Sequence, residues 1–101
     1  MILEVLPSAN EEIELSFLFY EAQRLGLGVQ FLSAVEDGYH RLLANPKAWP
    51  PLQSSKRFRR KLLNGFPYGL IYVENEKKIT IVAVMHLARK PGYWHKRRPL
   101  P

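Results

Sequence analysis

The 101-residue sequence contains no cysteine, which excludes disulfide bonds and thiolate metal ligands and is typical of proteins in a reducing compartment. It also has no apolar run near the ~18–20 residues that would span a bilayer. The opening MILEVLPSANEE has neither the basic segment nor the apolar core of a signal peptide. These absences predict a single cytoplasmic domain over residues 1–101, with no membrane contact and no cofactor.

Acidic residues are scarce in the second half of the chain. Residues 51–101 carry twelve lysines and arginines against Glu74 and Glu76, a net charge of +10. Residues 1–50 carry three cations against seven acidic residues, a net charge of −4. Clustered cations raise the local potential and release counterions on phosphates, so the second half favours contact with a polyanion or an acidic partner. A general contribution to solubility is the alternative.

Short-range patterns in the first half predict one strand and two helices. MILEVL (1–6) is rich in strand-forming residues. The sequence S-A-N-E, beginning at Ser8, matches a capping box, so a helix is expected over residues 8–25. The glycines of GLG (26–28) interrupt the apolar helical period, which then resumes as far as an Asn-Pro pair. We therefore expect an antiparallel helical hairpin over residues 8–45.

The second half reads as a loop followed by strands. PKAWPPLQSS (46–55) contains three prolines and is expected to be a loop. Residues 56–86 change to a period of two and predict three strands, of which YGLIYV and KITIVAVMH are apolar enough to be covered on both faces. The order β-α-α-β-β-β indicates an α+β fold with two layers. In this fold the helical hairpin packs on one face of a small, mainly antiparallel sheet.

The last strand ends at His86, and a basic tail follows over residues 87–101. Strand alternation is expected to place His86 on the face of Thr80, Val82 and Val84. The cations and aromatics that follow indicate an ordered segment at the strand end, in which the Tyr-Trp pair either anchors the tail or presents a ring for stacking. The final KRRPLP is expected to be a solvated basic extension.

Three longer stretches carry a family resemblance. They are YEAQRLGLGVQFLSAVEDGYHRLLANP, RRKLLNGFPYGLIY and AVMHLARKPGYWHKR. In this order they resemble the helical hairpin, the second and third strands, and the C-terminal motif of the ParE/RelE superfamily. Its members are toxins of bacterial type II toxin–antitoxin (plasmid stabilisation) modules. The resemblance implies a cognate antitoxin that forms a hetero-oligomer with the toxin and neutralises it. It also implies one of two targets, DNA gyrase or the ribosome with its mRNA.

RelE-like members of the superfamily cut mRNA in the ribosomal A site without a metal. Cleavage by 2′-OH attack needs a base, cations that stabilise the phosphate, and an acid or stacking group. His86, Arg89 and Tyr93 are the candidate catalytic residues for these functions. The loop at 46–55 contains a single lysine, Lys47, where RelE-like enzymes often hold a dense lysine cluster. This departure favours ParE-like inhibition of gyrase, leaves enzyme activity open, and keeps a metal-free ribonuclease as the alternative.

Five residues are candidates for contact with the antitoxin or the target: Arg59, Arg60, Lys61, Trp94 and Arg97. Strand alternation places Arg60 opposite Arg59 and Lys61, so these three cations cannot all face one ligand. A further alternative is a non-toxic basic module that binds nucleic acid. The histidines have no Cys, Asp or Glu at metal-ligand spacing, so no metal site is predicted.

Overall fold

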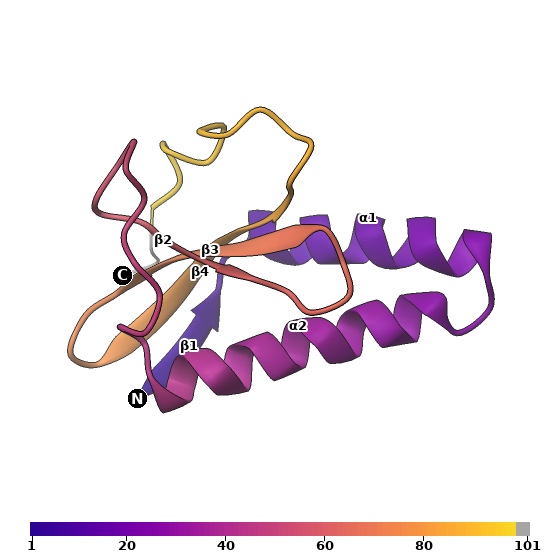
Figure 1. Cartoon of the computed structure of the whole chain (residues 1–101), viewed down its shortest axis with the longest axis horizontal. Coiled ribbons are helices and arrows are strands. Elements are labelled where there is room, and N and C mark those ends of the chain that lie inside the picture. Colours follow the sequence, from indigo (N-terminus) through magenta and orange to yellow (C-terminus); the bar gives the residue numbers. More distant parts are fainter. Residues whose placement is uncertain (99–101) are drawn as a thin grey trace.

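The computed structural model describes residues 1–98, so the last three residues of the predicted basic tail lie outside the described part of the chain. Six elements follow one another in the order β-α-α-β-β-β (Figure 1). Their bounds are β1 Ile2–Val5, α1 Pro7–Gln23, α2 Leu27–Ala44, β2 Arg59–Leu62, β3 Tyr68–Glu74 and β4 Lys78–His86. This order confirms the α+β fold class.

The four strands form one mixed sheet in the order β1-β4-β3-β2. β1 pairs with β4 in parallel, whereas the β2–β3 and β3–β4 pairs are antiparallel. The two helices lie beside each other as a hairpin against the sheet (Figure 1). A mainly antiparallel sheet carrying a helical hairpin is the predicted arrangement. No helix within residues 1–98 has the length and apolar character needed to cross a bilayer.

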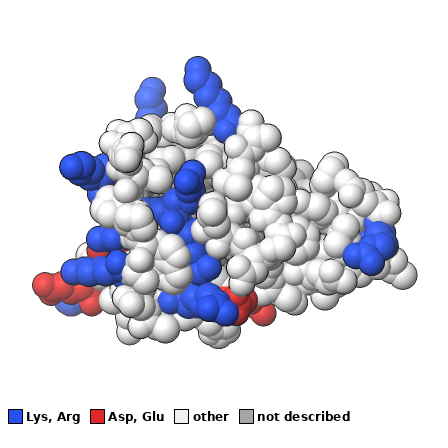
Figure 2. All heavy atoms as spheres, viewed as in Figure 1, with Lys and Arg blue, Asp and Glu red and all other residues white. Residues whose placement is uncertain are grey.

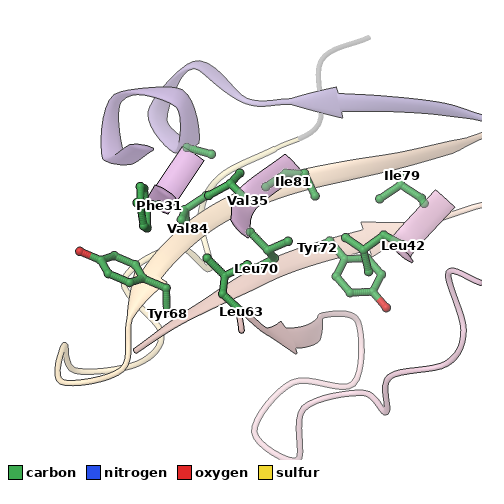
Figure 3. Close-up of a cluster of buried hydrophobic side chains, with 11 residues drawn as sticks. Phe31, Val35, Leu42, Leu63, Tyr68, Leu70, Tyr72, Ile79, Ile81 and Val84 are labelled. Carbon is green, nitrogen blue, oxygen red and sulfur yellow. The ribbon is translucent and has the colours of Figure 1, made fainter. Parts of the chain in front are cut away.

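The core between the helices and the sheet is built by side chains from α2 and the two central strands (Figure 3). Each such apolar side chain contributes roughly 1.5–3 kcal/mol through its removal from water. Gly38 lets α2 approach the sheet closely, because a Cβ at this position would lie 2.7 Å from Leu70 Cδ1. The fully buried members of this core are Ala9 of α1 together with Phe31, Leu42, Leu70, Tyr72, Ile79 and Ile81.

The start of α1 differs from the sequence prediction. The helix begins at Pro7, Leu6 is its N-cap, and no side chain caps it, so the capping box at Ser8 was wrong. Proline is favoured at the first helical position because its φ is already helical and it has no N–H to satisfy. The Leu6 carbonyl accepts the N–H groups of Ala9 and Asn10 at 2.9 and 3.0 Å, which leaves Ser8 inside the first turn.

A bulge in β4 overturns the predicted placement of His86. Two successive residues of β3 pair with Ala83 and Ile81, so Val82 is an extra residue in β4. A bulge shifts the alternation of side chains along the strand. Val82 and Ala83 accordingly pack in the cluster on the far face, whereas Val84 belongs to the helix-facing core. His86 shares the face of Val84 and not that of Val82.

Irregular segments cover the face of the sheet that the helices leave open. Residues 87–98 turn back from the end of β4, and the loop after α2 lies beside them (Figure 1). Most of β3 and nearly all of β4 are buried as a result, which confirms that both faces of these strands are covered. The buried side chains of this second cluster are Leu6, Phe58, Ile71, Val82, Ala83, Met85 and Trp94.

Candidate functional site

Trp94 anchors the tail to the sheet. Its side chain is 1% exposed, and its ring centroid lies 4.7 Å from that of Phe58. It packs in the same cluster as Ile71 and Met85. Trp94 is a sequence-predicted contact for the antitoxin or the target, yet in this conformation it presents almost no surface to a partner. Its burial favours the anchoring alternative for this residue.

Glu12, in the early part of α1, holds the tail through its carboxylate. The carboxylate accepts the Tyr93 hydroxyl hydrogen at 2.6 Å and a hydrogen bond from Arg97 Nη1 at 3.0 Å. Arg89 Nη1 lies 3.4 Å from the same group. The side chains of Glu12 and Arg97 are 12% and 23% exposed, so water screens this ion pair weakly, whereas the Arg89 side chain is 53% exposed and its attraction to Glu12 is screened more. One carboxylate therefore ties three residues of the tail to the helical layer.

Glu12 and Arg97 also form hydrogen bonds with backbone groups at the free edge of β4. The pairing of β4 with β1 ends at Ile81, so the residues beyond it have no strand on that side. The Val84 N–H donates to Glu12 Oε1 at 3.0 Å, and Arg97 Nη1 donates to the Val82 carbonyl at 3.0 Å. Unpaired backbone groups at a sheet edge need such partners. The prediction of a solvated extension was therefore wrong for Arg97, since this side chain satisfies both the edge and the carboxylate.

Tyr93 keeps its proton in this environment. Burial raises its pKa, and the hydrogen bond to Glu12 raises the pKa further, because both oppose ionisation of the phenol. The guanidinium carbon of Arg89 lies 3.7 Å from the ring centroid, and that of Arg97 lies 5.1 Å from it. The hydroxyl thus serves as a donor to Glu12 near neutral pH.

His86 closes the turn at the end of β4. Its Nδ1 accepts the Ala88 N–H at 2.9 Å, and its ring meets Tyr68 edge-on with centroids 5.0 Å apart. The structure therefore brings two of the candidate catalytic residues, Arg89 and Tyr93, together at Glu12. His86 instead contacts Ala88 and Tyr68. Within residues 1–98 no cluster of three or more His, Cys, Asp or Glu side chains could hold a metal.

The three cations of β2 lie on two faces, as the alternation predicts. Arg59 and Lys61 share the helix-facing side, where Arg59 Nη1 donates to the Trp49 carbonyl at 2.6 Å. Lys61 is 5% exposed and donates to the Leu62 carbonyl, and burial lowers its pKa. Of the three, Arg60 alone is exposed, and it lies on the opposite face.

Arg60 borders a groove of about 540 Å³ between the loop at 50–54 and the tail. Most lysines and arginines visible in Figure 2 gather over the sheet end of the molecule, and few lie on the part built by the helices. The groove lies in this basic half of the chain. Its other lining residues come from the sheet and the tail: Ile71, Met85, Pro91 and Trp94.

Glu12 is the residue of this region that the sequence does not reveal. Its place near the start of a helix suggests an interaction with the helix dipole, as for the neighbouring glutamates. Its partners in the structure are 72 to 85 residues away along the chain. No short-range pattern connects residues at that separation, so this function of Glu12 emerges only from the fold.

A family model described as the ParE toxin of the type II toxin–antitoxin system parDE matches residues 3–91. The chain belongs to the ParE toxin family. This confirms the ParE/RelE resemblance and identifies the ParE branch. Glu12, His86 and Arg89 lie within the matched residues, whereas Tyr93, Trp94 and Arg97 lie beyond them.

The ParE-like fold is also seen in a solved structure titled "Chromosomal ParDE TA system from P. aeruginosa". It superposes with a TM-score of 0.67 and 20% sequence identity, over 86% of this chain and 96% of that chain. At this identity the likeness shows the shared fold. No curated protein sequence matches the chain.

Proposed function

We propose that this ParE-family protein arrests bacterial growth by inhibiting DNA gyrase and is neutralised by a cognate antitoxin. The family match over residues 3–91 supports the toxin assignment. The protein acts in the cytoplasm, where its target is found, and it is held in a hetero-oligomer with the antitoxin until it is released. Inhibition of this kind requires a binding surface and no hydrolytic centre.

The choice of gyrase inhibition over RNA cleavage rests on one observation: the side chains of His86 and Tyr93 form hydrogen bonds with different partners. A general base and acid must both reach the reacting hydroxyl and phosphate. His86 uses its Nδ1 to close a turn, and Tyr93 donates its proton to Glu12. Arg89, the candidate cation, lies on the ring of Tyr93. These placements support inhibition by binding over metal-free cleavage of RNA.

Induced expression in bacteria tests this proposal. The parent protein is expected to produce filamented cells and DNA damage signalling, and co-expression of the antitoxin from the adjacent gene is expected to prevent both. His86→Ala is expected to remain toxic, because the histidine has no chemical step to perform. The melting temperature of the variant must be measured alongside, since His86 contributes to the turn after β4.

The ribonuclease alternative makes the opposite forecast. Loss of a general base lowers a rate by ~10²–10⁴-fold, so His86→Ala would abolish toxicity while the fold is intact. Cleavage of ribosome-bound mRNA by the parent protein, lost in this variant, would replace the gyrase proposal. Expression without any effect on growth, together with salt-dependent binding to nucleic acid, would indicate the non-toxic module instead.

A further inference from the structure

The loop before β2 and the C-terminal tail are joined by three aromatic rings in contact. The Phe58 ring centroid lies 4.7 Å from that of Trp94 and 5.6 Å from that of His95. Trp94 and His95 also contact each other, with centroids 4.5 Å apart. Phe58 and Trp94 are buried, so they form an apolar base that holds the two segments side by side.

Exposed cations from both segments surround this aromatic base. The guanidinium carbon of Arg57 lies 5.5 Å from the Phe58 ring centroid. On the tail, Arg98 Nη1 donates to the His95 carbonyl at 3.4 Å. A lysine neighbours each contact in the sequence, before Arg57 and after His95. We call these four exposed residues the basic rim: Lys56, Arg57, Lys96 and Arg98.

The basic rim has no acidic partner within residues 1–98. The ion pairs of this part of the chain use five other cations: Arg41, Arg59, Lys78, Arg89 and Arg97. The sequence explains the difference, because residues 46–73 and 77–98 contain no acidic residue at all. The positive charge of the rim therefore faces solvent without compensation, as do the basic side chains that stand out from the sheet end of the molecule in Figure 2.

Clustered cations of this kind attract a polyanion. Lysines and arginines that neutralise phosphates release the counterions condensed around a nucleic acid, which favours binding. Duplex DNA carries one negative charge per ~1.7 Å of its axis, so several neighbouring cations can each meet a phosphate. The rim, with four cations contributed by two adjacent segments, suits such a row of phosphates better than a single small anion.

The surroundings of the rim favour duplex DNA over a single strand or an acidic peptide. Single-stranded nucleic acid is bound by exposed aromatic rings on which bases stack. Phe58 and Trp94 are 3% and 1% exposed, so neither ring can stack a base or receive an apolar side chain of a peptide. Contacts to the phosphates of a duplex need cations and no apolar surface. This is the chemistry that the rim presents.

We propose that the basic rim binds the phosphate backbone of duplex DNA. Under the proposed function this DNA is the duplex on which gyrase acts, so the toxin contacts the enzyme and its DNA together. The choice of duplex DNA rests on that proposed function, whereas the phosphate chemistry rests on the contacts above. Binding through phosphates carries no sequence information, so the rim acts at any site where gyrase is found on DNA.

A salt titration of DNA binding tests the rim with defined probes. Fluorescence anisotropy of a labelled duplex of about 20 base pairs is measured with the parent protein over a range of salt concentrations. Four phosphate contacts predict that log K falls with log[salt] at a slope of about −3 to −4. The duplex should bind more tightly than a single strand of equal length or a polyglutamate of equal charge. Tighter binding of either competitor would overturn the proposal.

Three variants of equal charge locate the contact. Arg57→Gln and Lys96→Gln each remove one cation of the rim, and Arg24→Gln removes an exposed cation at the C-terminal end of α1. Each rim variant should reduce the slope by about one and weaken binding by about 5–10-fold in ~0.1 M salt, whereas Arg24→Gln should change it less than about twofold. Melting temperatures check that these exposed substitutions leave the fold intact. Equal weakening by all three variants would overturn the proposal, because binding would then follow net charge alone.

A gyrase supercoiling assay separates the rim from the proposed function. The double variant Arg57→Gln/Lys96→Gln should need at least about 10-fold more protein than the parent for half inhibition, and Arg24→Gln should inhibit as the parent does. Unchanged inhibition by a double variant that no longer binds the duplex would overturn the proposal. If the parent inhibits supercoiling but does not bind the duplex, the rim proposal fails and gyrase inhibition stands. If the parent binds the duplex but leaves supercoiling unaffected, gyrase inhibition fails and the phosphate contact stands.

Discussion

The two faces of the sheet are covered in different ways. On one face two long helices supply a continuous apolar layer, in which α2 packs directly on β3 and β4 (Figure 3). On the other face two irregular segments depend on one indole, Trp94, and one carboxylate, Glu12. The helical face is closed by regular packing, whereas the second face retains a groove with a free arginine. A cover fixed at a few points thus leaves an open groove on this face.

Truncation of Trp94 should have the largest effect on the second face. Trp94→Ala removes a fully buried aromatic side chain and is expected to lower the free energy of unfolding by about 3–5 kcal/mol. Phe31→Ala, its counterpart under the helices, is expected to fall in the same range. Urea denaturation of both variants makes the comparison. A loss below about 1 kcal/mol for Trp94→Ala would mean that the tail is not part of the cooperative fold.

Removal of the Glu12 carboxylate should cause the second-largest loss of stability. Glu12→Ala leaves Arg97 and the Val84 N–H without their acceptor, and we expect a loss of roughly 2–4 kcal/mol. Glu14→Ala, an exposed glutamate on the same helix, is the control and should stay within about 0.5 kcal/mol. Equal effects of the two substitutions in thermal and urea unfolding would contradict the assigned function of Glu12.

Tyr93 should give a smaller and pH-dependent effect. Tyr93→Phe removes one hydrogen bond to a charged group, a loss of about 1–2 kcal/mol near pH 7. The fold raises the pKa of Tyr93, so this stabilisation is complete below the ordinary tyrosine pKa of about 10 and is lost as the pH rises through the higher pKa of the folded state. Unfolding free energies of parent and variant should therefore converge above about pH 10. A constant difference across that range would show that the hydroxyl is not coupled to Glu12.

The smallest effect is expected on the helical side. Asp37 and Arg41 form an ion pair on α2 whose side chains are 48% and 56% exposed. Asp37→Asn should lower stability by about 0.3–0.5 kcal/mol, and this difference should vanish in 1 M salt. If Asp37→Asn lowered the free energy of unfolding as much as Glu12→Ala does, the exposed ion pair would be as stabilising as the partly buried one, which would contradict this comparison.

Short-range patterns were sufficient to predict the helical side of the molecule. The apolar period identified both helices, the Gly-rich break between them, and the strands, and alternation along β2 separated Arg60 from Arg59 and Lys61. These features depend on residues within a few positions of one another, where side-chain direction follows from backbone geometry.

The tail side depended on contacts that no local pattern contains. The bulge at Val82 reversed the expected face of His86. On the helical side one local prediction was wrong, because Pro7 displaced the expected cap of α1. Arg97 was expected in solvent and is bound by Glu12, on the far end of the chain. Such pairings are decided by the fold as a whole, because a strand edge and a carboxylate must both find partners.

We propose that this ParE-family protein acts by binding gyrase and not by cutting RNA. One preparation of the purified protein should be divided between a gyrase supercoiling assay and a cell-free translation assay. We expect that the protein inhibits supercoiling, that translation continues, and that His86→Ala behaves as the parent does in both assays. Uninhibited supercoiling together with arrested translation and cleaved mRNA, reversed by His86→Ala, would contradict it.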